Sequence, residues 1–245
     1  MEGMKEAIEY VVGLSQPNYA EHEGEKWADK PMYRIHHELP KANALQMCTL
    51  DSLVGYIKSN TDKMDKHMLI HVQSPTKVVL MSELDVDRCR EKLVEVNAML
   101  PQFTFDTYYP AESFVINVMS KFMDNDDKEQ ILKYAGTIET GTIAKYGDDG
   151  VSQKATIQQT CTSKAEAIIP NPVRLAPYRT FLEVEQPSSD FIFRARDDAR
   201  EPQFALFEAD GGAWKLEAMN SVAAYLKDAI QELHIEQDIT FTVIS

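Results

Sequence analysis

The chain has 245 residues, 44% of them hydrophobic and 26% charged, a balance that is typical of folded globular proteins and excludes a disordered or collagen-like chain. Its 39 Asp and Glu outnumber its 25 Lys and Arg, which gives a formal net charge of -14. An acidic protein repels the phosphates of nucleic acids. We therefore do not expect direct nucleic-acid binding to be its function.

The N-terminal residues carry acids, at Glu2, Glu6 and Glu9, where a secretory signal peptide carries basic residues. No stretch of the chain approaches the roughly 18 consecutive apolar residues that a bilayer-spanning helix needs. The sequence therefore predicts a cytoplasmic protein without a membrane partner.

The cysteines and histidines do not form a recognisable metal motif. Cys48, Cys89 and Cys161 lie far apart and include no CxxC pair, so we predict reduced thiols in the core rather than disulfides or a zinc site. His67 and His71 would share one strand face, but no carboxylate motif accompanies them. We predict no metal and no cofactor.

Apolar residues recur three or four positions apart in several stretches, which indicates amphipathic helices. These stretches predict helices over residues 2–15, 85–99, 111–123, 126–135 and 216–233, and a helix that is capped by Thr49 or Asp51 and runs through Ile57. The helix at 85–99 depends on Val86, Leu93 and Val96 sharing one face.

Runs rich in β-branched and aromatic residues predict the strands. They cover residues 32–39, 44–50, 67–73, 76–83, 102–109, 191–196, 203–209 and 238–244. Only Ser74 and Pro75 separate two of these runs, which predicts a hairpin. Residues 16–31 are predicted to form a polar loop, and four prolines between residues 168 and 187 favour extended backbone on the surface.

Residues 137–160 predict a long hairpin with unusually polar arms and a turn at Asp148, Asp149 and Gly150. We expect this ribbon to project from the body or to pair with another subunit. Because strands and helices occur in mixed order without a repeated βαβ spacing, the predicted fold class is α+β, with a mixed, mainly antiparallel sheet and flanking helices. We predict one domain over residues 1–245, with any subdivision at this hairpin.

No known catalytic motif occurs in the sequence, so we predict no catalytic residues and a protein that is not an enzyme. There is no GxSxG elbow, GxxxxGK[ST] loop or GxGxxG loop. Asp210, Gly211 and Gly212, followed by Trp214, could cradle a phosphate with backbone N–H groups. They could also form a strand-to-helix turn that uses the positive φ of glycine, and this second interpretation needs no ligand.

Five arginines gather with aromatic residues between residues 174 and 200 of this otherwise acidic chain. Such a mixture is typical of subunit interfaces, and it can also stack on nucleic-acid bases. The alternative is that the arginines pair within the chain with nearby acids such as Glu183, Glu185 and Asp190. The residues that we single out as a candidate interface are Arg174, Tyr178, Arg179, Phe181, Phe191, Phe193, Arg194 and Arg196.

Three segments carry a resemblance to a known family. They are NPVRLAPYRTFLEVEQPSSDFIFRAR (171–196), ALFEADGGAWKLEA (205–218) and HMLIHVQSPTKVVLMSELD (67–85). The chain resembles the YfdQ-like family of tailed-phage and prophage proteins over most of its length from about residue 45 onward. The resemblance implies a phage origin, a place in the cytoplasm of infected or lysogenic bacteria, and a gene often found among replication and recombination functions. The family has no established catalytic residues to carry over.

Three functions are compatible with these observations. The leading hypothesis is a non-enzymatic phage protein that assembles with copies of itself into a ring or closed shell. The second is an accessory factor of phage DNA recombination or replication, or an acidic inhibitor of a host nuclease or defence system. The third is a nucleotide-binding or hydrolytic protein built on the Asp210 turn. The expected partners are the chain itself and, for the second hypothesis, DNA-metabolism proteins of host or phage.

Overall fold

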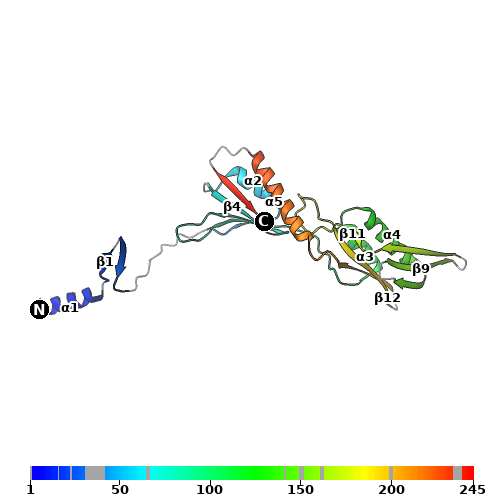
Figure 1. Ribbon diagram of the computed structural model, residues 1–245, viewed down its shortest axis with the longest axis horizontal. Coiled ribbons are helices and arrows are strands. Elements are labelled where there is room, and N and C mark those ends of the chain that lie inside the picture. The colour runs from blue at the N-terminus through cyan, green and yellow to red at the C-terminus, as the bar shows by residue number, and fades with distance from the viewer. Residues whose placement is uncertain are drawn as a thin grey trace. The chain divides into compact units, whose positions relative to one another are not determined.

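The structure is a computed structural model whose contacts divide the chain into two compact units, Met1–Lys41 and Ala42–Ser245 (Figure 1). The division falls at residue 42, and the subdivision that the sequence suggests within 137–160 stays a prediction. The predicted strand at 32–39 lies outside the described residues. The structure describes residues 2–15, 17–22, 24–30, 42–64, 67–140, 142–148, 152–160, 163–198, 201–233 and 239–245.

The N-terminal unit begins with α1 (Glu2–Ser15), which confirms the predicted first helix. Met4, Ile8 and Val11 recur at helical spacing and share one face. All three side chains are exposed, so α1 is an amphipathic helix whose apolar face is not buried.

A short hairpin occupies the region that the sequence predicts to be a polar loop. β1 (Tyr19–His22) and β2 (Glu25–Ala28) pair in antiparallel fashion. The backbone N–H and the side-chain amide of Asn18 each donate a 2.8 Å hydrogen bond to the Asp29 carboxylate, which ties the two ends together. The loop prediction is wrong here because strands of only four residues, YAEH and EKWA, are too short to show a clear alternation of apolar and polar residues.

The larger unit contains a five-stranded sheet with two helices, which we call the five-stranded lobe. The strand order is β14-β4-β5-β6-β3, antiparallel in the middle and parallel at both edges. Helices α2 and α5 share a buried core with the sheet (Figure 1). The elements are β3 (Leu45–Met47), α2 (Leu50–Ser59), β4 (His67–Ser74), β5 (Lys77–Ser82), β6 (Lys92–Asn97), α5 (Trp214–Glu232) and β14 (Thr240–Ile244).

The structure confirms the predicted hairpin and helix cap in this lobe. Strands β4 and β5 pair directly across the turn at Pro75 and Thr76. The Thr49 hydroxyl accepts a 3.2 Å hydrogen bond from the Ser52 N–H and so caps α2. The predicted C-terminal strand is also present, as the edge strand β14.

The helix predicted at 85–99 is wrong, because this region is a tight loop followed by strand β6. The Asp85 carboxylate accepts hydrogen bonds from the N–H groups of Asp87 and Cys89, at 2.9 and 2.8 Å, and these bonds fix the loop. Val94 and Val96 then alternate into the core with exposed or half-buried neighbours. Pairing with β5 therefore overrides a spacing that also fits a helix.

The rest of the larger unit contains a four-stranded and a three-stranded sheet, which we call the four-stranded lobe. Their strand orders are β11-β12-β13-β7 and β10-β9-β8. Helices α3 and α4 and the four-stranded sheet bury one core. The elements are β7 (Tyr109–Pro110), α3 (Ala111–Lys121), α4 (Asp126–Thr140), β8 (Thr142–Asp148), β9 (Ser152–Thr160), β10 (Ser163–Pro170), β11 (Val173–Leu175), β12 (Ser189–Asp198) and β13 (Glu201–Glu208).

Aromatic rings fill the core of the four-stranded lobe. Phe193 and Phe204 stack with ring centres 5.7 Å apart, and Phe114 packs 5.4 Å from Phe204. All three side chains are fully buried. Phe193 comes from β12, Phe204 from β13 and Phe114 from α3. These rings therefore join the two strands to the helix.

The polar hairpin predicted at 137–160 is present as β8 and β9, and β10 adds a third strand to it. The helix predicted to end near residue 135 continues to Thr140. The side chains of the ribbon lie outside the described residues. Its projection from the body stays a prediction.

Two extended segments differ from their predictions. Residues 102–109, predicted to be a strand, form an irregular segment of which only Tyr109 pairs in a sheet. In this segment Phe103 and Phe105 pack on the aromatic core, and Asp106 has a φ of 59° that interrupts a strand. Residues 168–187, predicted to be extended backbone on the surface, are extended in β10 and β11, but residues 176–188 form an irregular segment with a turn at Leu182 and Glu183. More than half of the side chains in 176–189 are buried rather than on the surface.

The fold class is α+β, as predicted, with strands distributed over sheets of two, three, four and five strands. The core of the five-stranded lobe takes residues from 47 to 98 and again from 219 to 243, together with Phe181 and Val184. The core of the four-stranded lobe takes only residues between 103 and 206. The second core is therefore inserted in the sequence between two halves of the first.

Candidate interaction surface

The structure buries half of the residues that the sequence singles out as a candidate interface. Phe181, Phe191 and Phe193 belong to the hydrophobic cores, and Arg179 is only 8% exposed. These side chains fill the interior and do not form an accessible surface. The accessible members of the predicted set are Arg174, Tyr178, Arg194 and Arg196.

Arg179 is the centre of a buried polar network. Its Nη1 donates to Glu208 Oε1 at 3.1 Å, and its Nη2 donates to the Pro187 carbonyl at 3.2 Å and to the Ser189 hydroxyl. Its guanidinium carbon lies 4.0 Å from the centre of the Trp214 ring. Burial lowers the pKa of Arg179 to about 10 although nearby carboxylates oppose the change, so the group stays charged at neutral pH. The network holds the 176–189 segment against β13 and α5.

Asp210 occupies the N–H groups that a bound phosphate would need. Its Oδ1 accepts a 2.9 Å hydrogen bond from the Gly212 N–H, and its Oδ2 accepts a 2.6 Å bond from the Ser189 hydroxyl. Burial by itself would raise the pKa of Asp210, but these bonds, one from the Trp214 N–H and the nearby guanidinium charge together lower it. Gly211 and Gly212 have positive φ values of 64° and 82°. The geometry favours a helix-starting turn over a phosphate cradle.

The 176–189 segment also contacts the five-stranded lobe. The Thr180 hydroxyl donates a 2.6 Å hydrogen bond to the Pro75 carbonyl. Glu183 Oε1 accepts a 2.6 Å bond from the Leu50 N–H, at the start of α2. The predicted pairing of an arginine within the chain exists at Arg179, but its ion-pair partner is Glu208 and not one of the acids that the sequence suggested.

The accessible arginines on the strands make contacts within the chain. Arg196 donates from Nε and Nη2 to Gln203 Oε1 at 2.9 and 2.7 Å, and its guanidinium carbon lies 4.0 Å from the centre of the Tyr108 ring. The Arg174 main chain donates to Asp127 and accepts from Asn125. Arg196 is thereby held beside β13, and the Arg174 main chain ties β11 to the start of α4.

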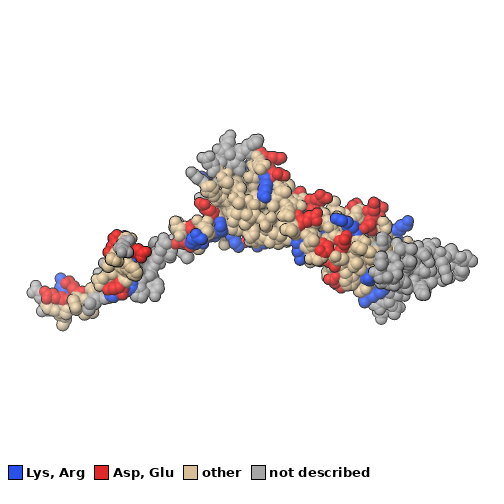
Figure 2. Space-filling model, viewed as in Figure 1, with Lys and Arg blue, Asp and Glu red and all other residues tan. Residues whose placement is uncertain are grey.

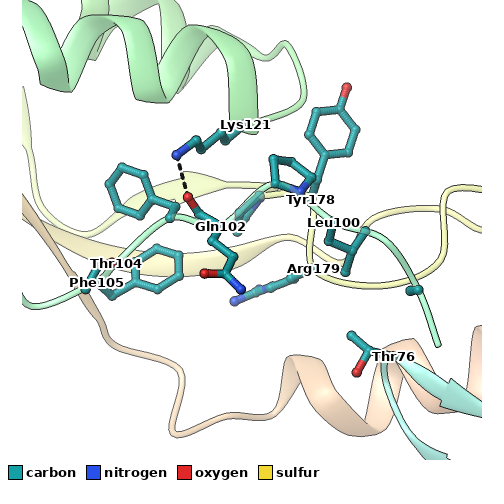
Figure 3. Close-up of a pocket in the computed structure, with 12 residues that line it drawn as sticks. Thr76, Leu100, Gln102, Thr104, Phe105, Lys121, Tyr178 and Arg179 are labelled. Carbon is teal, nitrogen blue, oxygen red and sulfur yellow. Dashed lines mark hydrogen bonds between the residues drawn. The ribbon is translucent and has the colours of Figure 1, made fainter.

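A cavity of about 590 Å³ lies beside Arg179, and its lining contains two cationic side chains and no carboxylate. Lys121 and Arg179 supply the positive charges, and Phe103, Phe105 and Tyr178 supply aromatic rings. Figure 3 shows Lys121 donating to the Gln102 carbonyl. We call this cavity the Lys121–Arg179 groove. Its size lies in the range of binding sites in proteins, and no sequence motif pointed to it because its residues come from four separate segments.

One donor of Arg179 has no acceptor. The Nε atom is buried and makes no hydrogen bond, in contrast to Nη1 and Nη2. A buried donor without an acceptor costs about 1–3 kcal/mol. This donor is one cost of burying the Arg179 side chain.

Among the residues that the structure describes, no group of three or more His, Cys, Asp or Glu side chains is placed to hold a metal ion. Cys48 and Cys89 are exposed free thiols, which corrects the prediction that the cysteines lie in the core. Cys48 follows the short edge strand β3, and Cys89 lies in the loop that replaces the predicted helix. Cys161 lies outside the described residues.

Charged side chains of both signs are mixed over the visible face of residues 42–245 in Figure 2, with no single basic patch. Over the described part of the chain, no helix combines the length and apolar character needed to cross a membrane.

Comparison with protein-family models, with curated proteins and with solved structures finds no significant match to this chain.

Proposed function

We propose that this chain is a non-enzymatic phage protein whose function is to assemble with copies of itself. The observation that carries the proposal is the exposed apolar face of α1. Met4, Ile8 and Val11 are 73%, 57% and 64% exposed. The phage origin rests on the resemblance of the three segments described above.

The N-terminal unit has no core of its own among its described residues. Every described side chain in it is exposed or half-buried, including Trp27 on β2. A helix of 14 residues is marginally stable in water when isolated, and so is a two-stranded hairpin. These elements gain stability when another surface covers them.

A second copy of the chain is the simplest source of that surface, because closed homo-oligomers are the commonest assemblies of soluble proteins. Two observations weaken the alternatives. Phe181, Phe191 and Phe193 are buried, so they do not offer a platform for stacking single-stranded DNA. The Asp210 carboxylate takes the place of a phosphate in the glycine turn.

The experiment is multi-angle light scattering of the purified full chain at micromolar concentration, followed by negative-stain imaging. We expect a mass that is a multiple of 27.8 kDa. A triple variant with Met4→Ser, Ile8→Ser and Val11→Ser removes the apolar face, and we expect its mass to fall toward that of one chain.

The matched control changes the polar face of the same helix, with Glu2→Gln, Glu6→Gln and Glu9→Gln. We expect this variant to keep the mass of the unmodified oligomer. A single-chain mass for the unmodified protein would overturn the proposal, as would equal masses for the two triple variants.

A further inference from the structure

We propose that β14 pairs in antiparallel fashion with β14 of a second copy of the chain, so that the two five-stranded sheets join into one. This inference rests on the proposed function, because it names a second surface, apart from α1, through which copies assemble.

Strand β14, the red strand in Figure 1, lies at the edge of its sheet. Among the described residues only β4 pairs with it. Its other side therefore presents backbone N–H and C=O groups that no described strand bonds. An edge of this kind is a template for a further strand.

Strand β14 lacks the features that protect sheet edges in proteins. Its five residues include no charge and no proline, and all five residue types favour strands. Among the other described edge strands, β3, β7 and β11 have three residues or fewer, and β1, β2, β8 and β10 each contain charged residues. Short length and charge are what discourage pairing at an edge. Of these edges, β14 is therefore the one that is most open to another strand.

The hydrophobic core of the five-stranded lobe is incompletely covered beside β14. Phe241 and Val243 belong to this core but are only half-buried. Ile230, Leu233 and Ile239 are half-buried members of the same core, whereas the core residues of β4 and β5 are almost fully buried. A further strand on this edge would cover these side chains, and burial of apolar area is the main driving force of association.

A second copy fits this edge because β14 is complementary to itself. Core-facing residues must lie opposite core-facing residues, since a shift by one position turns every side chain to the other face of the sheet. A two-fold axis through Thr242, perpendicular to the sheet, meets this condition. It places Phe241 opposite the partner's Val243 and Thr242 opposite the partner's Thr242. Helices α2 and α5 of both copies then cover the same face of the joined sheet.

The pairing also brings no like charges together. The chain carries a formal net charge of -14, so two copies repel one another over most of their surfaces. Strand β14 contains no charged residue, and pairs of threonines that face one another across antiparallel strands are stabilising. An uncharged edge is therefore a place where two acidic copies can meet.

Disulfide formation through an engineered cysteine tests the register. The full chain carries Cys48→Ser, Cys89→Ser and Cys161→Ser, to remove the native thiols. Thr242→Cys then lies opposite its own counterpart across the two-fold axis, within the distance that a disulfide bridges. Under mild oxidation we expect a covalent species of two chains.

The matched control is Thr240→Cys, on the same face of β14. In the proposed register its counterpart lies four positions away along the partner strand, about 13 Å, which is too far for a disulfide. We expect a several-fold lower yield. A mixture of Thr240→Cys and Ile244→Cys chains should restore the cross-link, because these two positions face one another. Equal yields from Thr242→Cys and Thr240→Cys would overturn the inference.

Charge substitution tests the same contact in solution. It uses the triple variant with Met4→Ser, Ile8→Ser and Val11→Ser, in which we expect β14 to hold two chains together. Adding Thr242→Lys or Thr242→Glu places like charges opposite one another, and each should raise the dissociation constant about tenfold or more. Mixing the Thr242→Lys and Thr242→Glu chains pairs opposite charges and should restore the two-chain mass.

The control for charge is Gln46→Lys in the same triple variant. Gln46 is exposed on β3, the opposite edge strand of the same sheet, so we expect the two-chain mass to remain. Loss of that mass with Gln46→Lys, or no restoration in the mixture, would count against pairing through β14.

The outcomes separate this inference from the proposed function. A single-chain mass for the triple variant, together with an oligomeric mass for the unmodified chain, overturns pairing through β14 and leaves assembly through α1 standing. A single-chain mass for the unmodified chain overturns both. A triple variant that keeps the full oligomeric mass until Thr242→Lys is added overturns the role of α1 and supports that of β14.

Discussion

The guanidinium carbon of Arg179 lies 4.0 Å from the centre of the Trp214 ring, so an arginine from the proline-rich segment rests on the first residue of α5. The same guanidinium forms an ion pair with Glu208 at the end of β13. One side chain therefore joins three segments that are separated in the sequence. Substitution of Arg179 measures how much these contacts contribute to the stability of the fold.

Arg179→Met should destabilise the protein strongly. Removing one partner of a buried ion pair costs about 3–5 kcal/mol, but Glu208 is 36% exposed and regains water, so we expect about 3 kcal/mol. Urea unfolding followed by tryptophan fluorescence measures the change. Arg174→Met, at an exposed arginine on β11, is the control, and equal unfolding midpoints for the two variants would contradict the prediction.

Asp210→Asn should change how stability depends on pH. The folded state holds the pKa of Asp210 below its ordinary value, so the ionised carboxylate stabilises the fold above about pH 4 and this contribution is lost as the pH falls through the lowered pKa. We expect the difference between the unmodified protein and Asp210→Asn to shrink between pH 5 and 2 on this basis. Thermal unfolding across this range measures it.

The control for Asp210 is Asp190→Asn, at a half-buried aspartate on β12. Its free energy of unfolding should differ from that of the unmodified chain by less than that of Asp210→Asn does. If the stability difference between Asp210→Asn and the unmodified protein does not change with pH, the prediction is contradicted. The substitution then acts by disturbing the hydrogen bonds of this turn and not by removing the charge.

Glu183→Ala should weaken the start of α2. The Glu183 carboxylate accepts a 2.6 Å hydrogen bond from the Leu50 N–H, and loss of a helix N-terminal cap costs about 1 kcal/mol. Hydrogen exchange of the first turn of α2, measured by mass spectrometry, should increase. Glu185→Ala removes a nearby exposed acid and should leave the exchange of α2 as it is in the unmodified chain.

Phe193→Ala should unfold the four-stranded lobe far more readily than Tyr178→Ala. Phe193 is fully buried and stacks on Phe204, and truncation of a buried phenylalanine costs about 3–5 kcal/mol. Tyr178 is half-buried, so its truncation should lower the free energy of unfolding much less. Chemical denaturation compares the two, and a small effect of Phe193→Ala would return this residue to the candidate interface.

Cys48 and Cys89 should react with Ellman's reagent in the native protein, because both thiols are exposed. Cys48→Ser and Cys89→Ser should each remove one equivalent of fast-reacting thiol. Slow reaction of either residue until denaturant is added would contradict its placement on the surface.

Local patterns predicted the elements whose apolar residues gather on one face. The stripes of α1 and α3 and the hairpin of β4 and β5 follow directly from spacing. The helix prediction for residues 85–99 is wrong because the spacing of Val86, Leu93 and Val96 fits a helix as well as it fits a loop followed by a strand. Only the pairing with β5 decides between the two structures. Periodicity carries no information about the partner strand.

The candidate site was harder to predict than the fold. Phenylalanines such as Phe191 and Phe193 give the same sequence pattern in a core and in an interface. Only the structure shows that both side chains are buried and belong to the core. The acid that pairs with Arg179 lies 29 positions away, and the amide that Glu183 caps lies 133 positions away. The groove is lined by residues from four separate segments between Thr76 and Arg179. Lys121 appears in the sequence only as a single basic residue near the end of a helix.

The interleaving of the two cores sets the order in which the chain can fold during its synthesis. The four-stranded lobe has all its core residues between 103 and 206, so it can complete its core while the ribosome is still adding α5 and β14. Strand β4 has no partner on its β14 side until residues 240–244 emerge, and an unpaired strand edge invites pairing with other chains. Nascent copies on one messenger can therefore meet through this strand edge from the time β4 emerges until β14 does.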